Sequence, residues 1–358
     1  MEIRFVLSSI ALSGILLAGC GEEKKNGEIM EISVDLSQCK NLDLDPENLI
    51  LLETNDSSLI YDVGSLEKIG DRLYIYSGDF IRSFDASSGK YCGDISKHGE
   101  GPGEYTFISR FWAQGDTLHV WDSNLRKVFD YLPDGSFLGD RTPFHNGDCV
   151  KSIPSFFLES PAGGYYTINT YKGGTEPENP RYSFYDSNFN FVADLPGREM
   201  SDGSFIPDRG FSDRENNRVL VWEALKDTVF SLHPDRVEPV YAFNFGKNAF
   251  PADKQAIPDY YDRKDAYLAG EKGAWASMMR CFQVSGNYLY FSFVTNGFEN
   301  YLGRVDLRNN RAETYRISDP EKKWNQQSFI KLINDSVYIA FSDTTNVERN
   351  PALYKLSL

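Results

Sequence analysis

Asp71-Arg72-Leu73-Tyr74-Ile75-Tyr76 is the stretch that decides the fold, because a turn residue followed by a short apolar and aromatic strand recurs along the chain. Measured between the third residues of successive copies, the steps are 45, 47, 54, 70 and 48 residues. A repeat of about 40–50 residues is typical of one four-stranded propeller blade. The other copies are Asp116–Trp121, Gly163–Ile168, Asn217–Trp222, Asn287–Ser292 and Asp335–Ala340.

Further candidate strands surround each copy. A second strand follows about ten residues later, as at Lys127–Asp130, and a third follows a tight turn such as Asp134-Gly135. Another precedes the copy, as at Phe107–Ala113. Four strands per unit and six units predict an all-β fold, a six-bladed β-propeller over residues 29–358. An array of immunoglobulin-like domains is disfavoured, because each such domain needs about 100 residues.

The two ends of the chain are expected to meet in the last blade. The sixth unit stops after Leu353–Leu356, one strand short of the others, and an open sheet edge invites aggregation. We therefore expect an N-terminal strand to complete the last blade. Two segments are candidates, Ile32–Leu36 and Leu49–Leu52, and the sequence does not choose between them.

A glycine-rich segment joins the first two units. It reads Gly99-Glu100-Gly101-Pro102-Gly103-Glu104-Tyr105. The glycines permit positive φ and close backbone approach, Pro102 stiffens the turn, and Glu104 is expected to accept backbone N–H bonds. A structural role is favoured over an anion-binding loop, because the segment lacks the Lys and Ser/Thr of a phosphate loop.

The order of these features resembles a known family. The G-x-G-P-G-E-Y run, placed after a first blade and before an apolar strand, is similar to that of six-bladed β-propeller lipoproteins abundant in Bacteroidetes. These are loosely similar to NHL and TolB-type propellers. The resemblance covers nearly the whole chain after its leader and implies a fold, but no activity.

The N-terminus predicts export and a lipid anchor. An apolar run of 13 residues, Phe5–Leu17, is too short to span a bilayer and has the length of a signal-peptide core. Leu17-Ala18-Gly19-Cys20 follows and looks like a bacterial lipobox, in which the cysteine is acylated. We expect residues 1–19 to be a signal peptide, Cys20 to carry lipid and residues 20–28 to be a polar tether. The predicted location is the cell envelope, anchored to the outer membrane on its periplasmic or surface side.

The net charge limits the classes of partner, and the spacing of the cysteines limits the kinds of metal site and disulfide. The formal net charge is −15, which disfavours nucleic acid and leaves membrane contact to the acyl chains. The other cysteines are widely spaced and match no zinc pattern, so mostly free, buried thiols are expected, with one bridge possible. They are Cys39, Cys92, Cys149 and Cys281.

Candidate binding residues fall into two groups. The first strand of each blade lines the channel of a propeller, and here those strands carry Arg110, Trp112, Arg280 and Lys331. They either bind an anionic ligand or neutralise inward acidic groups, and the second role is favoured. The longest step contains an insert, residues 248–275, predicted to hold short helices at 251–257 and 259–269. It is either a surface elaboration, which is slightly favoured, or an aromatic lid with Tyr260, Tyr261, Tyr267 and Trp275.

No catalytic set emerges from the sequence. Asp and Asn concentrate in turns, and the histidines, His98, His119, His145 and His233, lack metal-ligand spacing. We therefore expect a binding module for a glycan, a peptide or a partner protein, without cofactor or metal. A scaffold within an envelope complex is the main alternative. A calcium-dependent lactonase or esterase is the third, since some six-bladed propellers have that activity.

Overall fold

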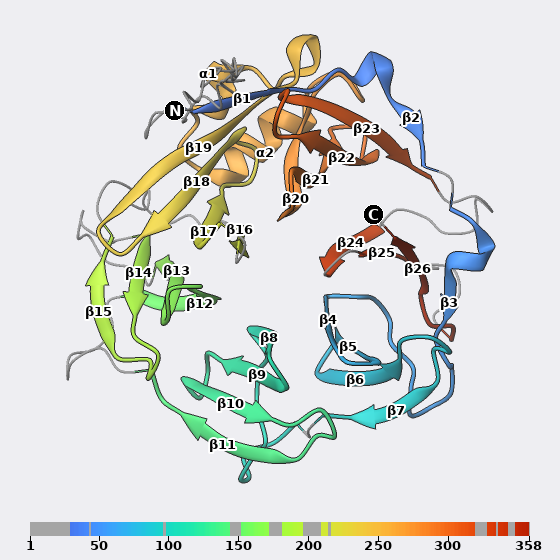
Figure 1. The fold of residues 1–358 in the computed structure, drawn as a ribbon, viewed down its shortest axis with the longest axis vertical. Coiled ribbons are helices and arrows are strands. Elements are labelled where there is room, and N and C mark those ends of the chain that lie inside the picture. Colours follow the sequence, from blue (N-terminus) through green and yellow to red (C-terminus); the bar gives the residue numbers. More distant parts are fainter. Residues whose placement is uncertain are drawn as a thin grey trace, which may run out of the picture.

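The computed structural model describes residues 29–42, 44–95, 98–143, 152–171, 181–195, 209–213, 216–318, 328–333, 336–342 and 348–357. In this part of the chain the fold is all-β and propeller-like: twisted sheets are arranged around a central axis (Figure 1). The repeated motif forms the second strand of each four-stranded unit, as the sequence predicts. Cys20, His145 and Cys149 lie outside the described residues.

The first three units are separate antiparallel sheets, each running from the axis outward in chain order. Unit 1 contains β4 (Ser65–Ile69), β5 (Arg72–Ser77), β6 (Phe80–Asp85) and β7 (Tyr91–Asp94). Unit 2 contains β8 (Arg110–Gln114), β9 (Thr117–Asp122), β10 (Lys127–Tyr131) and β11 (Phe137–Arg141). Unit 3 contains β12 (Ser152–Glu159), β13 (Tyr165–Tyr171), β14 (Tyr182–Tyr185) and β15 (Phe191–Asp194).

The next two units belong to one larger sheet because an N-terminal strand, β1 (Met30–Ser33), lies between their outer strands. Unit 4 contains β16 (Arg209–Asp213), β17 (Arg218–Trp222), β18 (Thr228–His233) and β19 (Arg236–Asn244). Unit 5 contains β20 (Ala276–Ser285), β21 (Tyr288–Thr295), β22 (Asn300–Asp306) and β23 (Arg311–Ile317). Between them lie η3 (Gly246–Asn248), α1 (Ala252–Gln255) and α2 (Tyr260–Leu268), close to the predicted helices.

Unit 6 combines both ends of the described chain. It contains β24 (Ser328–Ile333), β25 (Ser336–Phe341), β26 (Ala352–Ser357) and the N-terminal β3 (Leu49–Leu51). Strand β3 pairs antiparallel with β26, with Ile50 opposite Leu353. The other candidate segment has a different place, because β1 pairs in parallel with β19 and β23.

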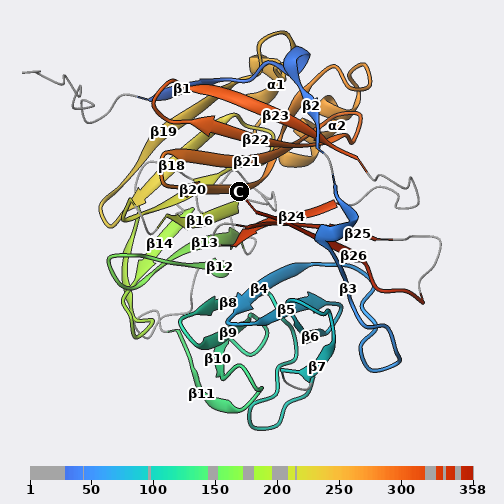
Figure 2. The same ribbon diagram turned by 45° about the vertical axis from the view of Figure 1, so that its right-hand side comes forward.

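Residues 29–42 and 44–52 form an N-terminal strap along the outer edges of units 4, 5 and 6 (Figures 1 and 2). Besides β1 and β3 it contains β2 (Lys40–Asn41), which pairs with β23, and the short helices η1 (Leu36–Gln38) and η2 (Pro46–Asn48). Its apolar side chains enter three different core clusters: Ile32 and Val34 the first, Leu44 the second, and Ile50 the third. The strap therefore ties three units together by burial as well as by strand pairing.

The innermost strands contact one another in cyclic order. β4 contacts β8, β8 contacts β12, and β12 contacts β16; β16 contacts β20, β20 contacts β24, and β24 contacts β4. Successive apolar residues of a strand point alternately into the seams on its two sides, so that Leu73 and Ile75 lie in one core cluster and Tyr74 in the next. This pattern is expected for strands that are buried on both faces.

The thiols differ in part from the expectation. Cys39 and Cys92 are free, but Cys39 is only partly buried and Cys92 is exposed. Cys92 lies on the outer strand β7, where alternate side chains point to solvent, which explains its exposure. Cys281 lies in β20, and its side chain is outside the described part of the chain.

Candidate functional site on the crossover face

One face of the molecule collects exposed apolar side chains. In each unit the inner strand begins at this face and the antiparallel second strand ends there. We call it the crossover face. The side chains exposed on it, each 36–68% accessible, are Tyr61, Phe80, Phe107, Leu125, Tyr261, Leu268 and Phe298.

In unit 2 a buried carboxylate fixes two of these residues. Asp122 ends β9 and is fully buried. Its Oδ2 accepts hydrogen bonds from the backbone N–H of Phe107 at 3.0 Å and of Thr106 at 2.6 Å, while Oδ1 accepts from the N–H of Leu125 at 2.9 Å. One side chain thus holds the crossover from unit 1 against the hairpin of unit 2.

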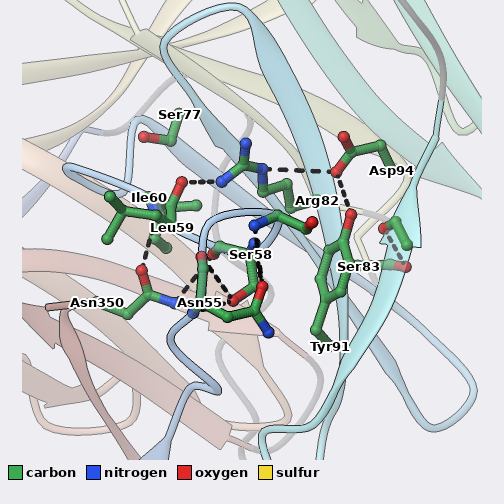
Figure 3. Close-up of polar contacts among 12 residues, drawn as sticks. Asn55, Ser58, Leu59, Ile60, Ser77, Arg82, Ser83, Tyr91, Asp94 and Asn350 are labelled. Atoms are coloured by element: carbon green, nitrogen blue, oxygen red, sulfur yellow. Dashed lines mark hydrogen bonds and ion pairs between the residues drawn. The ribbon is translucent and has the colours of Figure 1, made fainter. Parts of the chain in front are cut away.

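In unit 1 a serine occupies the corresponding position. Ser77 ends β5, and its Oγ accepts from the backbone N–H of Tyr61 at 3.2 Å and donates to Asp62 Oδ1 at 3.1 Å. The hairpin that follows carries Phe80, over whose ring the Arg82 guanidinium lies at 5.1 Å. Arg82 donates to the Leu59 carbonyl and faces Asp94 at 3.5 Å, as Figure 3 shows.

Asn350 joins the two ends of the described chain at this face (Figure 3). It is 3% exposed; its Oδ1 accepts from the Ile60 N–H at 2.7 Å, and its Nδ2 donates to the carbonyls of Glu53 at 2.7 Å and Ser58 at 3.0 Å. Buried backbone groups that lose such a partner remain desolvated and unsatisfied, which is costly. Asn350 is therefore the polar contact that holds the crossover from unit 6 to unit 1.

Asn350→Ala is expected to lower the free energy of unfolding by about 3 kcal/mol, because three buried hydrogen bonds of about 1 kcal/mol each are lost. Urea denaturation of the two proteins measures this. Asn287→Ala, at an exposed turn, is the matched control and should change stability by less than about 0.5 kcal/mol. Equal effects of the two substitutions would show that the Asn350 contacts contribute nothing specific.

The helical insert is fixed to unit 4 by a buried ion-pair cluster. Glu223, 2% exposed, directly follows β17 and occupies the same position of the repeated motif as Asp122. Arg263 on α2 is fully buried and donates from Nη2 to Glu223 Oε1 at 2.6 Å. Lys226 Nζ lies 3.0 Å and Arg181 Nη1 3.5 Å from the other carboxylate oxygen. These three cations together hold the pKa of Glu223 below its usual range, although burial of the carboxyl opposes them.

The insert is also fixed to unit 5. Tyr267 is fully buried, and its hydroxyl donates to the Val294 carbonyl at 2.7 Å and lies 3.0 Å from the Trp275 carbonyl. The Asn296 amide donates to the carbonyl of Glu271 at 2.8 Å. The insert is thus a packed part of the crossover face, with its own small core of Leu225, Phe250 and Tyr267.

Asp227 lies where unit 4, unit 5 and α1 meet. Its carboxylate accepts from Gln255 Nε2 at 2.7 Å and Ser277 Oγ at 3.1 Å. Among the described residues no cation forms an ion pair with it. Burial raises the pKa of Asp227 to about 7, against which the two hydrogen bonds act only in part.

The predicted channel residues lie in different surroundings. Lys331 on β24 forms an ion pair with Glu67 on β4, at an N–O distance of 2.5 Å. Arg110 begins β8; burial lowers its pKa, and the negative charge of Glu67 opposes that shift. Arg280 lies in β20, and its side chain is outside the described part of the chain.

Trp112 faces a seam rather than an open channel. It is 7% exposed and stacks on His119 with the ring centroids 5.1 Å apart, next to Phe157 and Tyr165 of unit 3. His119 in turn contacts Asp130, at 2.6 Å, and Asp130 pairs with Arg141. A β-strand alternates its side chains between two neighbouring units, so a place on the first strand does not imply exposure to the axis.

The four predicted insert aromatics do not share one surface. Tyr261 is 54% exposed, whereas Tyr267 is buried and Tyr260 packs against the small core of the insert. Trp275 packs there too, with Lys254 Nζ 4.6 Å from its ring centroid. Tyr267 thus cannot stack on a ligand, because its helix turns it inward toward Phe250.

The glycine-rich segment closes on its own glutamate. The Gly101 N–H donates to Glu104 Oε2 at 3.0 Å, and a Cβ on Gly99 would lie 2.0 Å from the same oxygen. Tyr105 is fully buried between units 1 and 2. Pro102 lies in the turn, and the carbonyl of Gly103 accepts from the Tyr131 hydroxyl at 3.1 Å. These contacts fit the structural role that the sequence favours.

Gly103→Ala is expected to cost about 3 kcal/mol, because Gly103 has a φ of +73° and an added Cβ would lie 2.7 Å from the Phe137 ring. Gly115 offers the control: its φ is +58° and an added Cβ would meet nothing within 4 Å. Gly115→Ala should therefore cost only about 1 kcal/mol. Thermal unfolding compares the two, and similar losses would rule out a packing role for Gly103.

In four of the six copies a polar residue that the predicted motif did not include directly follows its six residues. Ser77, Asp122, Asn169 and Glu223 all occupy the seventh position of the repeated motif. They are polar residues directly after an apolar run, and in units 1, 2 and 4 they fix the loops of the crossover face. Aligning the copies one residue further would have exposed this pattern.

The described residues offer a hollow away from the crossover face, but no cluster of potential metal ligands and no helix suited to cross a membrane. The opposite face has a hollow of about 370 Å³ between units 6 and 1, lined by Glu47, Lys68, Asp71, Asp85, Ser87 and Lys355 among others. No group of three or more potential metal ligands is found in the described part of the chain. Within the same residues, no helix has the length and apolarity needed to cross a membrane.

Three solved structures are similar in fold. A Bacteroides fragilis protein inferred to be exported has 18% identity and a TM-score of 0.64, with 92% of this chain and 99% of that chain covered. A DUF4221 family member from Bacteroides vulgatus has 9% identity and a TM-score of 0.61, with 88% and 99% covered. A protein of unknown function from Bacteroides thetaiotaomicron has 9% identity and a TM-score of 0.52, with 89% and 74% covered.

Sequence comparison gives a family but no activity. The model of a family described as a domain of unknown function, DUF4934, matches residues 44–355. No curated protein sequence matches this chain. At these identities the structural similarities extend to the fold alone.

Proposed function

This chain belongs to the DUF4934 family, and from that premise we propose that it is an exported, lipid-anchored, six-bladed β-propeller that binds a ligand on its crossover face. The cyclic contacts of the inner strands and the pairing of β3 with β26 support the closed six-bladed ring. The leader and the Cys20 sequence support the anchor, on the periplasmic or surface side of the outer membrane.

The observation that carries the binding role is the set of exposed aromatic residues on fixed loops. Tyr61, Phe107 and Phe298 are 68%, 49% and 58% exposed, so none of them contributes fully to the core. Aromatic side chains held in place by buried hydrogen bonds are suited to bind a ligand, because little conformational freedom is lost on binding. A glycan, a peptide and a partner protein all offer surfaces for such contacts.

Screening the purified full-length protein against glycan and peptide arrays tests the proposal. We expect a bound ligand whose affinity falls at least tenfold when Tyr61, Phe107 and Phe298 are replaced by serine. Serine at Leu138 and Val192, which are exposed on the outer strands β11 and β15, is the matched control and should leave the affinity unchanged. A ligand that is lost with the control and kept by the first variant would contradict the proposed face.

A further inference from the structure

An apolar strip crosses the insert and the adjacent hairpin of unit 5. Tyr261 and Leu268 are 54% and 37% exposed and lie seven residues apart on α2, so they share one helix face about 10 Å apart along its axis. Asp265, also exposed, lies between them on that face. Phe298, 58% exposed, is on the hairpin between β21 and β22.

The hairpin and α2 touch where the strip crosses from one to the other. Asn296 Nδ2 lies 3.3 Å from the Tyr267 carbonyl, and a Cβ on Gly297 would lie 3.1 Å from the Gly273 nitrogen. Leu268 directly follows Tyr267, and Phe298 follows Gly297. Leu268 and Phe298 are therefore each next in sequence to a residue at which the hairpin meets the insert.

Folding does not account for the residue at position 298. Phe298 has a φ of +64°, and in the corresponding hairpin of unit 1 the positive φ of +60° belongs to Gly78. A bulky side chain in this region costs about 1–2 kcal/mol. In unit 4 Leu225 has a similar φ, +64°, but it is fully buried under the insert, which offsets the cost. Phe298 has no comparable burial, so its side chain is free to contact a partner.

The strip is held rigid. The Phe298 N–H donates to the Thr295 carbonyl at 2.9 Å, the Thr295 N–H to the Glu299 carbonyl at 3.0 Å, and the Asn296 N–H to the Trp275 carbonyl at 2.9 Å. Beneath α2, the Arg263 and Tyr267 contacts described above fix the helix. A prearranged apolar surface binds with a smaller entropy cost than a mobile one.

The segment that carries the strip is acidic, on the strip itself at Asp265 and at its border. Along residues 259–272 the carboxylates outnumber the lysines four to two, since the one arginine, Arg263, is buried against Glu223. The carboxylates are Asp259, Asp262, Asp265 and Glu271, and the lysines are Lys264 and Lys272. Together with a net charge of −15, this border repels anionic ligands and attracts basic groups.

We infer that the strip docks a basic, amphipathic segment of a partner protein, with apolar side chains on Tyr261, Leu268 and Phe298 and lysines or arginines facing the acidic border. The inference rests on the proposed binding role of the crossover face and names its partner class. A neutral glycan is the competing occupant, because aromatic rings also stack on sugars.

Fluorescence anisotropy tests this with a labelled amphipathic peptide of leucine and lysine, added to the full-length protein. We expect saturable binding that weakens at least tenfold in the L268S/F298G variant, in which glycine also relieves the positive φ at position 298. A matched peptide of leucine and glutamate should bind at least tenfold more weakly. Val192→Ser, at an exposed position on the outer strand β15 and away from the crossover face, is the control and should change the affinity less than twofold.

Three results would overturn the inference. Unchanged peptide binding in L268S/F298G places the peptide elsewhere, and if Phe107→Ser then abolishes it, the crossover face still stands as a binding face. Displacement of the peptide by maltoheptaose indicates a glycan site. Absence of peptide binding to the wild-type chain, while the array ligand still binds, rejects the basic partner and leaves the proposed function standing. Hydrogen exchange should show protection by the peptide at residues 259–269 and 295–299.

Discussion

Glu223→Gln is expected to lower the free energy of unfolding by about 3–5 kcal/mol, because it leaves buried cations without their carboxylate. Arg263 is fully buried, and the side chain of Arg181 is 5% exposed. Glutamine keeps the shape of the side chain, removes its charge and replaces one of its two acceptor oxygens with an NH2 donor. Urea denaturation of wild type and variant measures the difference.

The consequence should be visible at the insert. Hydrogen exchange in α2 should accelerate in Glu223→Gln, because Arg263 is what holds this helix against unit 4. Glu238→Gln is the control: Glu238 pairs with Arg236 and His233 at the surface, with its side chain 42% exposed. Surface ion pairs contribute about 0–1 kcal/mol. A loss for Glu223→Gln as small as that of the control would contradict the buried cluster.

Asp227 is expected to make the protein less stable as the pH rises from about 4 to about 7. The folded carboxyl has a pKa of about 7 against 3.8 for its ordinary value, so the folded protein holds the proton over this range while the unfolded chain releases it. The stabilisation that Asp227 gives through its raised pKa is fully present below about pH 4 and is lost as the pH rises through about 7. Three pKa units correspond to about 4 kcal/mol.

Asp227→Asn is therefore expected to stabilise the protein at pH 8 by up to about 4 kcal/mol and to leave it unchanged near pH 4. Asparagine retains one oxygen to accept from Gln255 Nε2, and its NH2 group can donate to Ser277 Oγ in place of the second carboxylate oxygen, so both contacts of the site persist. Thermal unfolding from pH 4 to 8 measures both proteins. Asp253→Asn, at an exposed position on α1, is the control. Parallel stability curves for Asp227→Asn and wild type would show that this carboxyl does not titrate in the range.

The repeated strands were predictable because their pattern is local. Leu73, Leu118 and Val219 each lie two residues after a turn residue and start an apolar run. Such a strand pattern can be recognised without knowledge of distant residues. The last unit was predictable for a different reason. Its own segment supplies one strand fewer than the other units, so the fourth strand has to come from elsewhere in the chain. Which N-terminal segment fills it was not, since Ile32 and Ile50 lie in equally short apolar stretches. Only the packing shows that one joins units 4 and 5 and the other unit 6.

The candidate site was less predictable because its contacts are long-range. Glu223 and Arg263 are 40 residues apart, and Asn350 and Ile60 are 290 apart, so no spacing rule connects them. For Trp112 the difficulty lies within its own strand. Its predicted strand, Phe107–Ala113, overlaps β8, but the direction of its side chain depends on register, which a one-residue shift reverses.

Hydrogen exchange at residues 49–51 tests the closed ring most directly. If β3 completes unit 6, the amides of this segment that bond to β26 should exchange as slowly as those of β26 itself, residues 352–354. Mass spectrometry of the exchanged, full-length protein resolves both segments. Exchange of residues 49–51 at the rate of an unstructured peptide, while β25 and β26 remain protected, would contradict the closure and with it the six-bladed ring.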